Sequence, residues 1–235
     1  MEVGLIEDFP FYDPWIGAEY ADRRRRIQND DHFSGSNWFV HVLGESHYVD
    51  DAAENSRDLT KRVVCRYSDP AGSSAVFFNR VLQAVQGCDY YAVNRDGWSD
   101  IAFSNYVQTP MSASRVAPND EQWAQAAKSL VGQLSITQPR VLLVLGKRNW
   151  DWFTYNHSDI MDSAPPLDVF RNGSKIEDAK IIAYQLGAQT LFTIAVWTYH
   201  PSSSRFNGQA ANDRVIAADM FHDNLIIEKQ KALLS

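Results

Sequence analysis

The chain has 235 residues, 45% of them hydrophobic, and a formal net charge of −7. This length suits a single α/β domain over residues 1–235, with residues 1–36 as an irregular or helical N-terminal extension. No apolar run approaches the roughly 18 residues of a membrane-spanning helix, and the acidic first residues do not resemble a signal peptide. We therefore expect a cytoplasmic protein, nucleoid-associated if bacterial, that binds no membrane.

The charged residues and the cysteines limit the possible partners. A negative net charge disfavours broad adhesion to nucleic acid, although a local basic patch is enough for binding. The arginine run at 23–26 is either such a patch or, as we favour, a solvated helix face paired with acidic neighbours. Cys65 and Cys88 are too few for a four-cysteine metal or iron–sulfur site. We expect two buried free thiols and no metal or other cofactor.

Four apolar segments predict buried strands. In chain order they are WFVHVL (38–43), IAFSNYV (101–107), VLLVL (141–145) and LFTIAVWTY (191–199). Helical patterns occupy 76–86, which Gly87 closes, the segment that begins with an N-cap cluster at 118–120, and the C-terminal segment from 210. The stretch 156–178, rich in Asp, Pro, Ser and Gly, predicts a surface loop.

Strands that alternate with helices imply crossover connections. The expected fold is a three-layer α/β/α sandwich around a central, mostly parallel, four-stranded sheet. In such sheets ligands bind beyond the carboxyl ends of the strands.

Polar residues collect at these strand ends. The first strand is followed by the motif GESHY (44–48), the second contains Asn105, the third is followed by Gly146, and the fourth by His200. A single histidine or asparagine is more often structural than catalytic. Four such strand ends together indicate a functional site.

The order GESHY, FSNYVQ, VLLVLG, HPSSSRF resembles the uracil-DNA glycosylase superfamily over residues 38–207. The His-Pro-Ser motif is the most specific part of the resemblance, and GESHY is the least faithful. The resemblance implies a monomeric, cofactor-independent DNA glycosylase of base excision repair. Such an enzyme flips a uracil or another modified or damaged base out of single- or double-stranded DNA, hydrolyses its N-glycosidic bond and leaves an abasic site.

The resemblance also implies roles for individual residues in the base pocket. His200 would donate a hydrogen bond to the departing base anion, and Asn105 would read the base through its carboxamide. Gly44 belongs to the base pocket, and Tyr48 stands where the uracil-specific branch has a tyrosine that excludes a 5-methyl group. The alternative for Tyr48 is a tyrosine on the rim of the site.

Two further groups of residues follow from the resemblance. Phe77 or Phe78 would stack on the base, although both are equally well explained as core residues of a helix. The loop residues Ser202, Ser203, Ser204 and Arg205, with Lys147 and Arg148, would bind DNA phosphates, and Arg205 could also fill the gap left by the flipped base. The serine run is otherwise only a soluble turn.

The water-activating residue departs from the family pattern. Ser46 stands where the superfamily has Asp or Asn, and a serine hydroxyl is a poor general base without a partner. Glu45 is the preferred substitute, His47 is the second candidate, and a third possibility is that the chain has no activator. A long insertion between the first motif and Phe77 also leaves open a bulkier modified base, including one used by invading DNA.

Two other classes of function compete with this hypothesis. One is a catalytically inactive, glycosylase-like protein that binds nucleic acid, which the serine at position 46 and the acidic net charge favour. The other is an unrelated α/β enzyme. The sequence lacks the GxSxG and GxxxxGKS motifs that a serine hydrolase or a P-loop protein needs.

Overall fold

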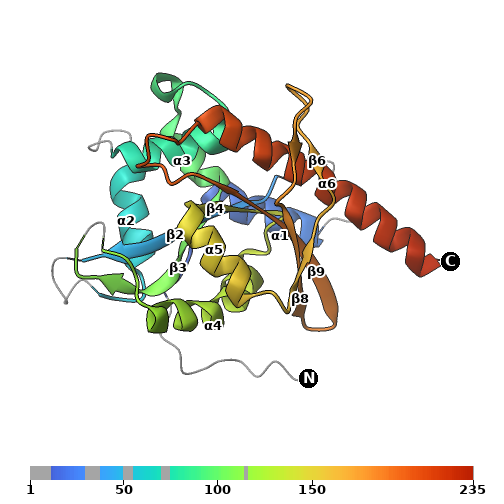
Figure 1. Cartoon of the computed structure of the whole chain (residues 1–235), viewed down its shortest axis with the longest axis horizontal. Coiled ribbons are helices and arrows are strands. Elements are labelled where there is room, and N and C mark those ends of the chain that lie inside the picture. Colours follow the sequence, from blue (N-terminus) through green and yellow to red (C-terminus); the bar gives the residue numbers. More distant parts are fainter. Residues whose placement is uncertain (1–11, 30–37, 50–54, 70–74, 114–115, 235) are drawn as a thin grey trace.

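The computed structural model describes residues 12–29, 38–49, 55–69, 75–113 and 116–234, with side chains as far as residue 229. Its centre is a seven-stranded sheet in the order β1-β3-β2-β4-β9-β8-β5 (Figure 1). The strands are β1 (Trp15–Ile16), β2 (Val40–Tyr48), β3 (Ala102–Met111), β4 (Val141–Leu145), β5 (Met161–Ser163), β8 (Lys180–Leu186) and β9 (Gln189–Thr198). Strands β3, β2, β4 and β9 are parallel neighbours, whereas β1, β8 and β5 pair antiparallel at the two sides.

The α/β class predicted from the sequence is confirmed, but the prediction of four strands is wrong. The four predicted segments form the parallel centre of the sheet. Two of the additional strands have only two or three residues, too few to show a period in the sequence. The third, β8, forms a hairpin with β9 in which Leu186 pairs with Gln189.

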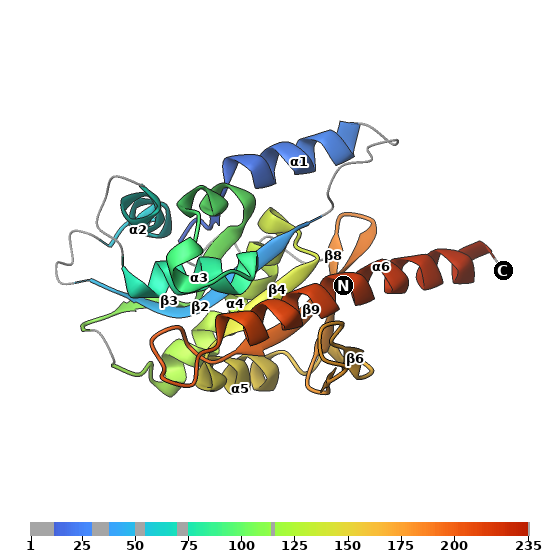
Figure 2. The same ribbon diagram turned by 90° about the horizontal axis from the view of Figure 1, so that it is seen from above.

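Helices cover both faces of the sheet (Figures 1 and 2). The helices are α1 (Ala18–Asn29), α2 (Leu59–Ser68), α3 (Val76–Gln86), α4 (Asp120–Thr137), α5 (Lys147–Asn156) and α6 (Gly208–Leu234), with short 3-10 helices at Tyr90–Ala92 and Arg95–Asp100. Alternate residues of β4 enter two separate apolar clusters. Val141, Leu143 and Leu145 pack with α3 and α6, whereas Leu142 and Val144 pack with α4 and α5. Strand β4 is therefore buried on both sides, which explains its unbroken apolar sequence.

Local signals in the sequence account for the helix ends. Gly87 closes α3 in the left-handed region, with φ of 65°, and its N–H donates to the Gln83 carbonyl. Asn119 caps α4 by accepting from the Gln122 N–H, and its own N–H donates to Oε1 of the Gln122 side chain. Both predicted helices are confirmed at these positions.

The segment 156–178 is more than the surface loop that we predicted. It holds β5 and a small hairpin of β6 (Leu167–Asp168) and β7 (Lys175–Ile176). Leu167 and Ile176 are buried in the apolar cluster that also contains residues of α6. The many Asp, Pro, Ser and Gly residues around them concealed this short apolar pattern.

The arginine run at 23–26 lies in α1, and its expected pairing with acidic residues is confirmed. Arg23 binds Asp100 at 2.7 Å, and Arg26 binds Asp22 at 2.7 Å on the same helix. Two carboxylates, Asp22 and Asp100, therefore pair with three of the four arginines, and Arg24 donates to the Ile136 carbonyl instead.

The two cysteines are free, as expected, but Cys65 is exposed on α2 and Cys88 is only half-buried. The prediction that both are buried is therefore wrong. None of the helices within the described ranges is both long enough and apolar enough to cross a membrane.

Candidate functional site at the carboxyl ends of the parallel strands

The carboxyl ends of the four parallel strands bring the sequence-predicted residues to one edge of the sheet. Gly44 of β2 pairs with Asn105 of β3. Gly146 follows the last residue of β4 directly, and His200 comes two residues after the end of β9. In the strand order β3-β2-β4-β9, Asn105 and His200 are therefore the outer members, and the two glycines lie between them.

The two glycines form a low floor between Asn105 and His200. A Cβ atom at Gly44 would overlap Oδ1 of Asn105, so the carboxamide lies directly over this glycine. A Cβ atom at Gly146 would lie 3.5 Å from the Cβ atom of His200. Three strand spacings of about 4.8 Å separate β3 from β9, about 14 Å in all, and the two side chains extend into this gap.

Asn105 is held firmly by its backbone and presents a free carboxamide. The residue is only 4% exposed. Its carbonyl oxygen accepts hydrogen bonds from Nε2 of Gln108 and, at 3.4 Å, from Nε2 of Gln133. Within the described part of the chain, the carboxamide itself makes no hydrogen bond. Because it offers both a donor and an acceptor, it can read a ligand with the complementary pair.

His200 is held in one tautomer when it is neutral. The backbone N–H of Ser202 donates to Nδ1 of His200 at 3.1 Å, so the proton of the neutral ring sits on Nε2. Burial, and then the nearby Arg148 charge, lower the pKa of His200, and Glu45 opposes this shift. The imidazole is therefore neutral at pH 7 and has one N–H to donate.

The structure separates the two candidate aromatics. Phe77 lies with its ring centroid 5.4 Å from that of His200 and 6.3 Å from that of Phe103. Phe78 is buried in the core, where it stacks on Tyr67 at 4.6 Å. Only Phe77 is therefore placed beside the strand ends, where it can contact a flat ligand.

The residues of the first motif point in different directions. Successive side chains of a strand alternate between faces, so Ser46 shares the face of Gly44 and Glu45 lies on the opposite face. Glu45 forms a two-point ion pair with Arg148, which joins Nε to Oε2 at 2.9 Å and Nη2 to Oε1. Both carboxylate oxygens are therefore engaged, and a water molecule must displace or share one of these contacts.

The last two residues of this motif lie apart from the glycine floor. His47 is buried, its Nε2 lies 2.9 Å from Oγ1 of Thr60, and burial lowers its pKa to about 4. The ring of Tyr12 packs against it edge-on. Tyr48 is 57% exposed at the end of β2. The structure thus places His47 in a buried contact with α2 and Tyr48 on the surface.

The conformation of the loop after His200 is held by hydrogen bonds within the protein. The N–H of Ser203 donates to the His200 carbonyl at 2.7 Å, and Arg205 N–H donates to Oγ of Ser203 at 3.1 Å. Nη1 of Arg80, on α3, binds the carbonyl oxygens of Pro201 and Ser203. Ser202 and Ser204 are exposed on this loop. The loop therefore presents backbone and hydroxyl groups from a fixed conformation.

Lys147 and Arg148, the two other predicted DNA-binding residues, open α5 beside this loop. Lys147 forms an ion pair with Asp151, and Arg148 forms the pair with Glu45. Both side chains are about half-exposed. Their charges are therefore partly compensated within the protein.

Sequence reasoning missed the residues that support the site from behind. Nδ2 of Asn149 donates to the carbonyl of Gly44 at 3.0 Å and also contacts those of Leu43 and Leu145. It thereby ties the ends of β2 and β4 to α5. Gln133 makes a similar connection between α4 and Asn105. No local motif marks these amides; only their place on the buried faces of the helices could have suggested them.

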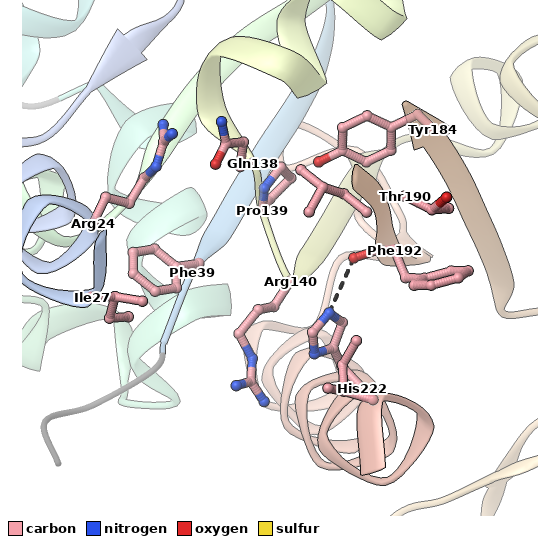
Figure 3. Close-up of a pocket in the computed structure, with 12 residues that line it drawn as sticks. Arg24, Ile27, Phe39, Gln138, Pro139, Arg140, Tyr184, Thr190, Phe192 and His222 are labelled. Carbon is pink, nitrogen blue, oxygen red and sulfur yellow. Dashed lines mark hydrogen bonds between the residues drawn. The ribbon is translucent and has the colours of Figure 1, made fainter. Parts of the chain in front are cut away.

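A cavity of about 210 Å³ lies at the opposite edge of the sheet, near the amino ends of the parallel strands (Figure 3). Its walls include Phe39, Arg140 and Phe192, and His222 donates from Nε2 to the Phe192 carbonyl at 3.0 Å. Arg140 is paired with Asp219 and lies close to Asp223 as well. None of the sequence-predicted site residues lines this cavity.

Neither metal clusters nor known proteins help to assign the site. Among the described residues, no group of three or more His, Cys, Asp or Glu side chains is placed to hold a metal ion. No protein-family model matches the chain, and no curated protein matches it. Its function has to be inferred from the geometry at the strand ends.

Proposed function

We propose that the protein is a monofunctional DNA glycosylase that hydrolyses the N-glycosidic bond of an everted uracil or other modified base and leaves an abasic site. One observation carries this proposal. Asn105 and His200 flank a floor of two glycines, Gly44 and Gly146, and Phe77 lies beside it. Gly44 leaves the space that the Asn105 carboxamide occupies, so this glycine allows the reading group to lie at the strand ends, where a flat heterocycle would meet both Asn105 and His200.

The donors at the two sides suit the chemistry of a departing base. Cleavage of the bond leaves negative charge on the base and positive charge on the sugar. The Nε2–H of neutral His200 is directed to a base oxygen, where a preorganised donor contributes about 3 kcal/mol to transition-state stabilisation. The Asn105 carboxamide reads the hydrogen-bonding edge of the base, and Phe77 stacks against its ring.

Water activation is assigned to Glu45, the carboxylate that follows Gly44 directly in β2. Its charge raises the pKa of His200, against the larger effect of burial. When bound DNA draws Arg148 towards a phosphate, a carboxylate oxygen of Glu45 becomes free to accept a proton from water. The order of the motifs, which resembles that of the uracil-DNA glycosylase superfamily, supports the proposed activity.

A panel of oligonucleotides tests the proposal. Strands that carry uracil, hypoxanthine, xanthine, 5-hydroxymethyluracil or a modified cytosine are incubated with the protein in EDTA and then treated with alkali. The proposal predicts strand breaks at one of these bases. The absence of breaks over the whole panel, together with saturable DNA binding, would instead identify a binding protein.

A catalytically inactive nucleic-acid-binding protein is the second candidate function. The observation that favours it is the two-point ion pair between Glu45 and Arg148, which occupies both oxygens of the only acid in the first motif. In that case Glu45 and Arg148 only join β2 to α5. The base pocket would then bind a flipped base without cleaving it.

A further inference from the structure

A second pocket lies next to His200, between the end of β9, the loop that contains Ser202–Ser204 and the start of α6. Its volume is about 210 Å³. We call it the Trp197 pocket and define it by Trp197, Tyr199, Arg205, Asn207 and Arg214, which all contribute to its walls. None of the roles assigned above to the base pocket uses Trp197, Tyr199 or Arg214.

The walls of this pocket combine aromatic rings with positive charges. The Arg214 guanidinium lies 5.5 Å from the centre of the Trp197 ring, and the ammonium of Lys147, which does not line the pocket, lies 5.8 Å from it. The Arg205 guanidinium lies 5.8 Å from the centre of the Tyr199 ring. Trp197 and Tyr199 pack edge to face with their centroids 5.3 Å apart. These spacings are in the range of cation–π contacts.

The charges of this pocket are not all compensated. Arg214 is paired with Asp178 at 2.9 Å. Within the described ranges, no carboxylate pairs with Arg205. Arg205 is exposed, and Tyr199 is 37% exposed. The pocket therefore keeps one free guanidinium next to an accessible aromatic ring.

The pocket also lies next to His200 along the chain. Tyr199 immediately precedes His200, so their Cα atoms are about 3.8 Å apart. Accessible aromatic rings beside arginines are the usual way in which proteins bind unpaired bases and their phosphates.

We propose that the Trp197 pocket binds the nucleotide adjacent to the everted one, with its base unpaired and stacked on Tyr199 and its phosphate on Arg205. This inference rests on the proposed function and extends it to the substrate class. Because the proposed base is unpaired, the protein is expected to prefer single-stranded over double-stranded DNA.

Fluorescence anisotropy of the full chain with a labelled thymidine oligonucleotide of about 12 residues tests this preference without any excision step. We expect the single strand to bind more tightly than the same strand annealed to its complement. Tyr199→Ala should weaken single-strand binding about 5- to 150-fold, and Tyr199→Phe, which keeps the ring, should restore it. Tyr155→Ala serves as the control, because Tyr155 is 76% exposed on α5 and lies outside the pocket.

Arg205→Ala gives an independent measurement on an exposed loop residue, so the test survives if Tyr199→Ala lowers the melting temperature. Loss of one phosphate contact should reduce the slope of log K against log salt by about 0.7 for a single strand. Equal affinity for both DNA forms, or unchanged binding by both alanine variants, overturns the inference. If no base is released from any strand but binding depends on Tyr199, the Trp197 pocket stands and the proposed hydrolysis fails.

Discussion

The Asn105 carboxamide lies over Gly44, at the place where the Cβ atom of any other residue would project. The two residues are Cα partners across β2 and β3, so the close approach is built into the sheet register. Residue 44 therefore has to be a glycine if the Asn105 carboxamide, which we assign to base reading, is to lie where it does.

Gly44→Ala should abolish most of the excision activity while leaving the fold intact. The added methyl group displaces the Asn105 carboxamide, and misplacing a reacting or reading group by about 1 Å can cost about 100-fold in rate. The measurement is the single-turnover excision rate on the oligonucleotide that the panel identifies. An alanine variant as fast as the wild type would show that the Asn105 carboxamide does not need its present position.

Glu45→Gln tests the assigned water activator. If Glu45 accepts the proton, the amide lowers the excision rate by about 10²- to 10⁴-fold with little change in DNA affinity. Asp151→Asn is a matched control, because Asp151 also pairs with a basic residue of α5. A Glu45→Gln variant that retains the wild-type rate would leave Glu45 with only its structural pairing to Arg148.

Phe77 and Phe78 should respond differently to truncation, although they are adjacent. Phe78→Ala removes a buried ring and should lower the free energy of unfolding by about 3–5 kcal/mol. Phe77→Ala should cost less stability but weaken binding of the everted base, because its ring lies next to His200. Urea unfolding and substrate affinity, measured for both variants, separate the two roles. The opposite pattern would move the stacking residue to Phe78.

The protein should lose stability in mild acid. Burial lowers the pKa of His47 to about 4 from the ordinary value of 6.5, so the folded state keeps this ring neutral. Below pH 6.5 His47 is protonated in the unfolded chain but not in the folded one, so this residue alone lowers the free energy of unfolding by about 1.4 kcal/mol per pH unit until about pH 4. His47→Gln should therefore recover about 2 kcal/mol of the loss between pH 6.5 and pH 5. Urea midpoints at these two pH values check this; an equal loss in both proteins would mean that His47 is protonated in the folded state.

The parallel centre of the fold could be predicted from the sequence because its strands are buried on both faces. The run VLLVL has no polar residue to confuse its assignment, and it forms β4 at the predicted positions. The edge strands β1 and β5 could not be recognised, because two or three residues show no period. The same limit applies to the β6–β7 hairpin within 156–178.

For the site, the rule that ligands bind beyond the carboxyl ends of parallel strands identified residues that do lie at one edge of the sheet. It could not determine the directions of their side chains. Glu45 and Arg148 are 103 positions apart, and neither local sequence predicts their ion pair. Phe77 and Phe78 are neighbours in a helix, so only the packing of α3 on the sheet distinguishes them. The aromatic–basic walls of the Trp197 pocket likewise come together only when α5 and α6 begin beside β9.

The central claim is that Asn105 and His200 form hydrogen bonds to the same base. Single-turnover excision by three proteins tests this claim most directly. Rates are measured for the wild type, Asn105→Ala and His200→Ala in EDTA, with free base as the detected product. We predict a fall of about 100-fold or more in each variant, with melting temperatures close to that of the wild type. Full activity in both variants would contradict the assignment of the pocket.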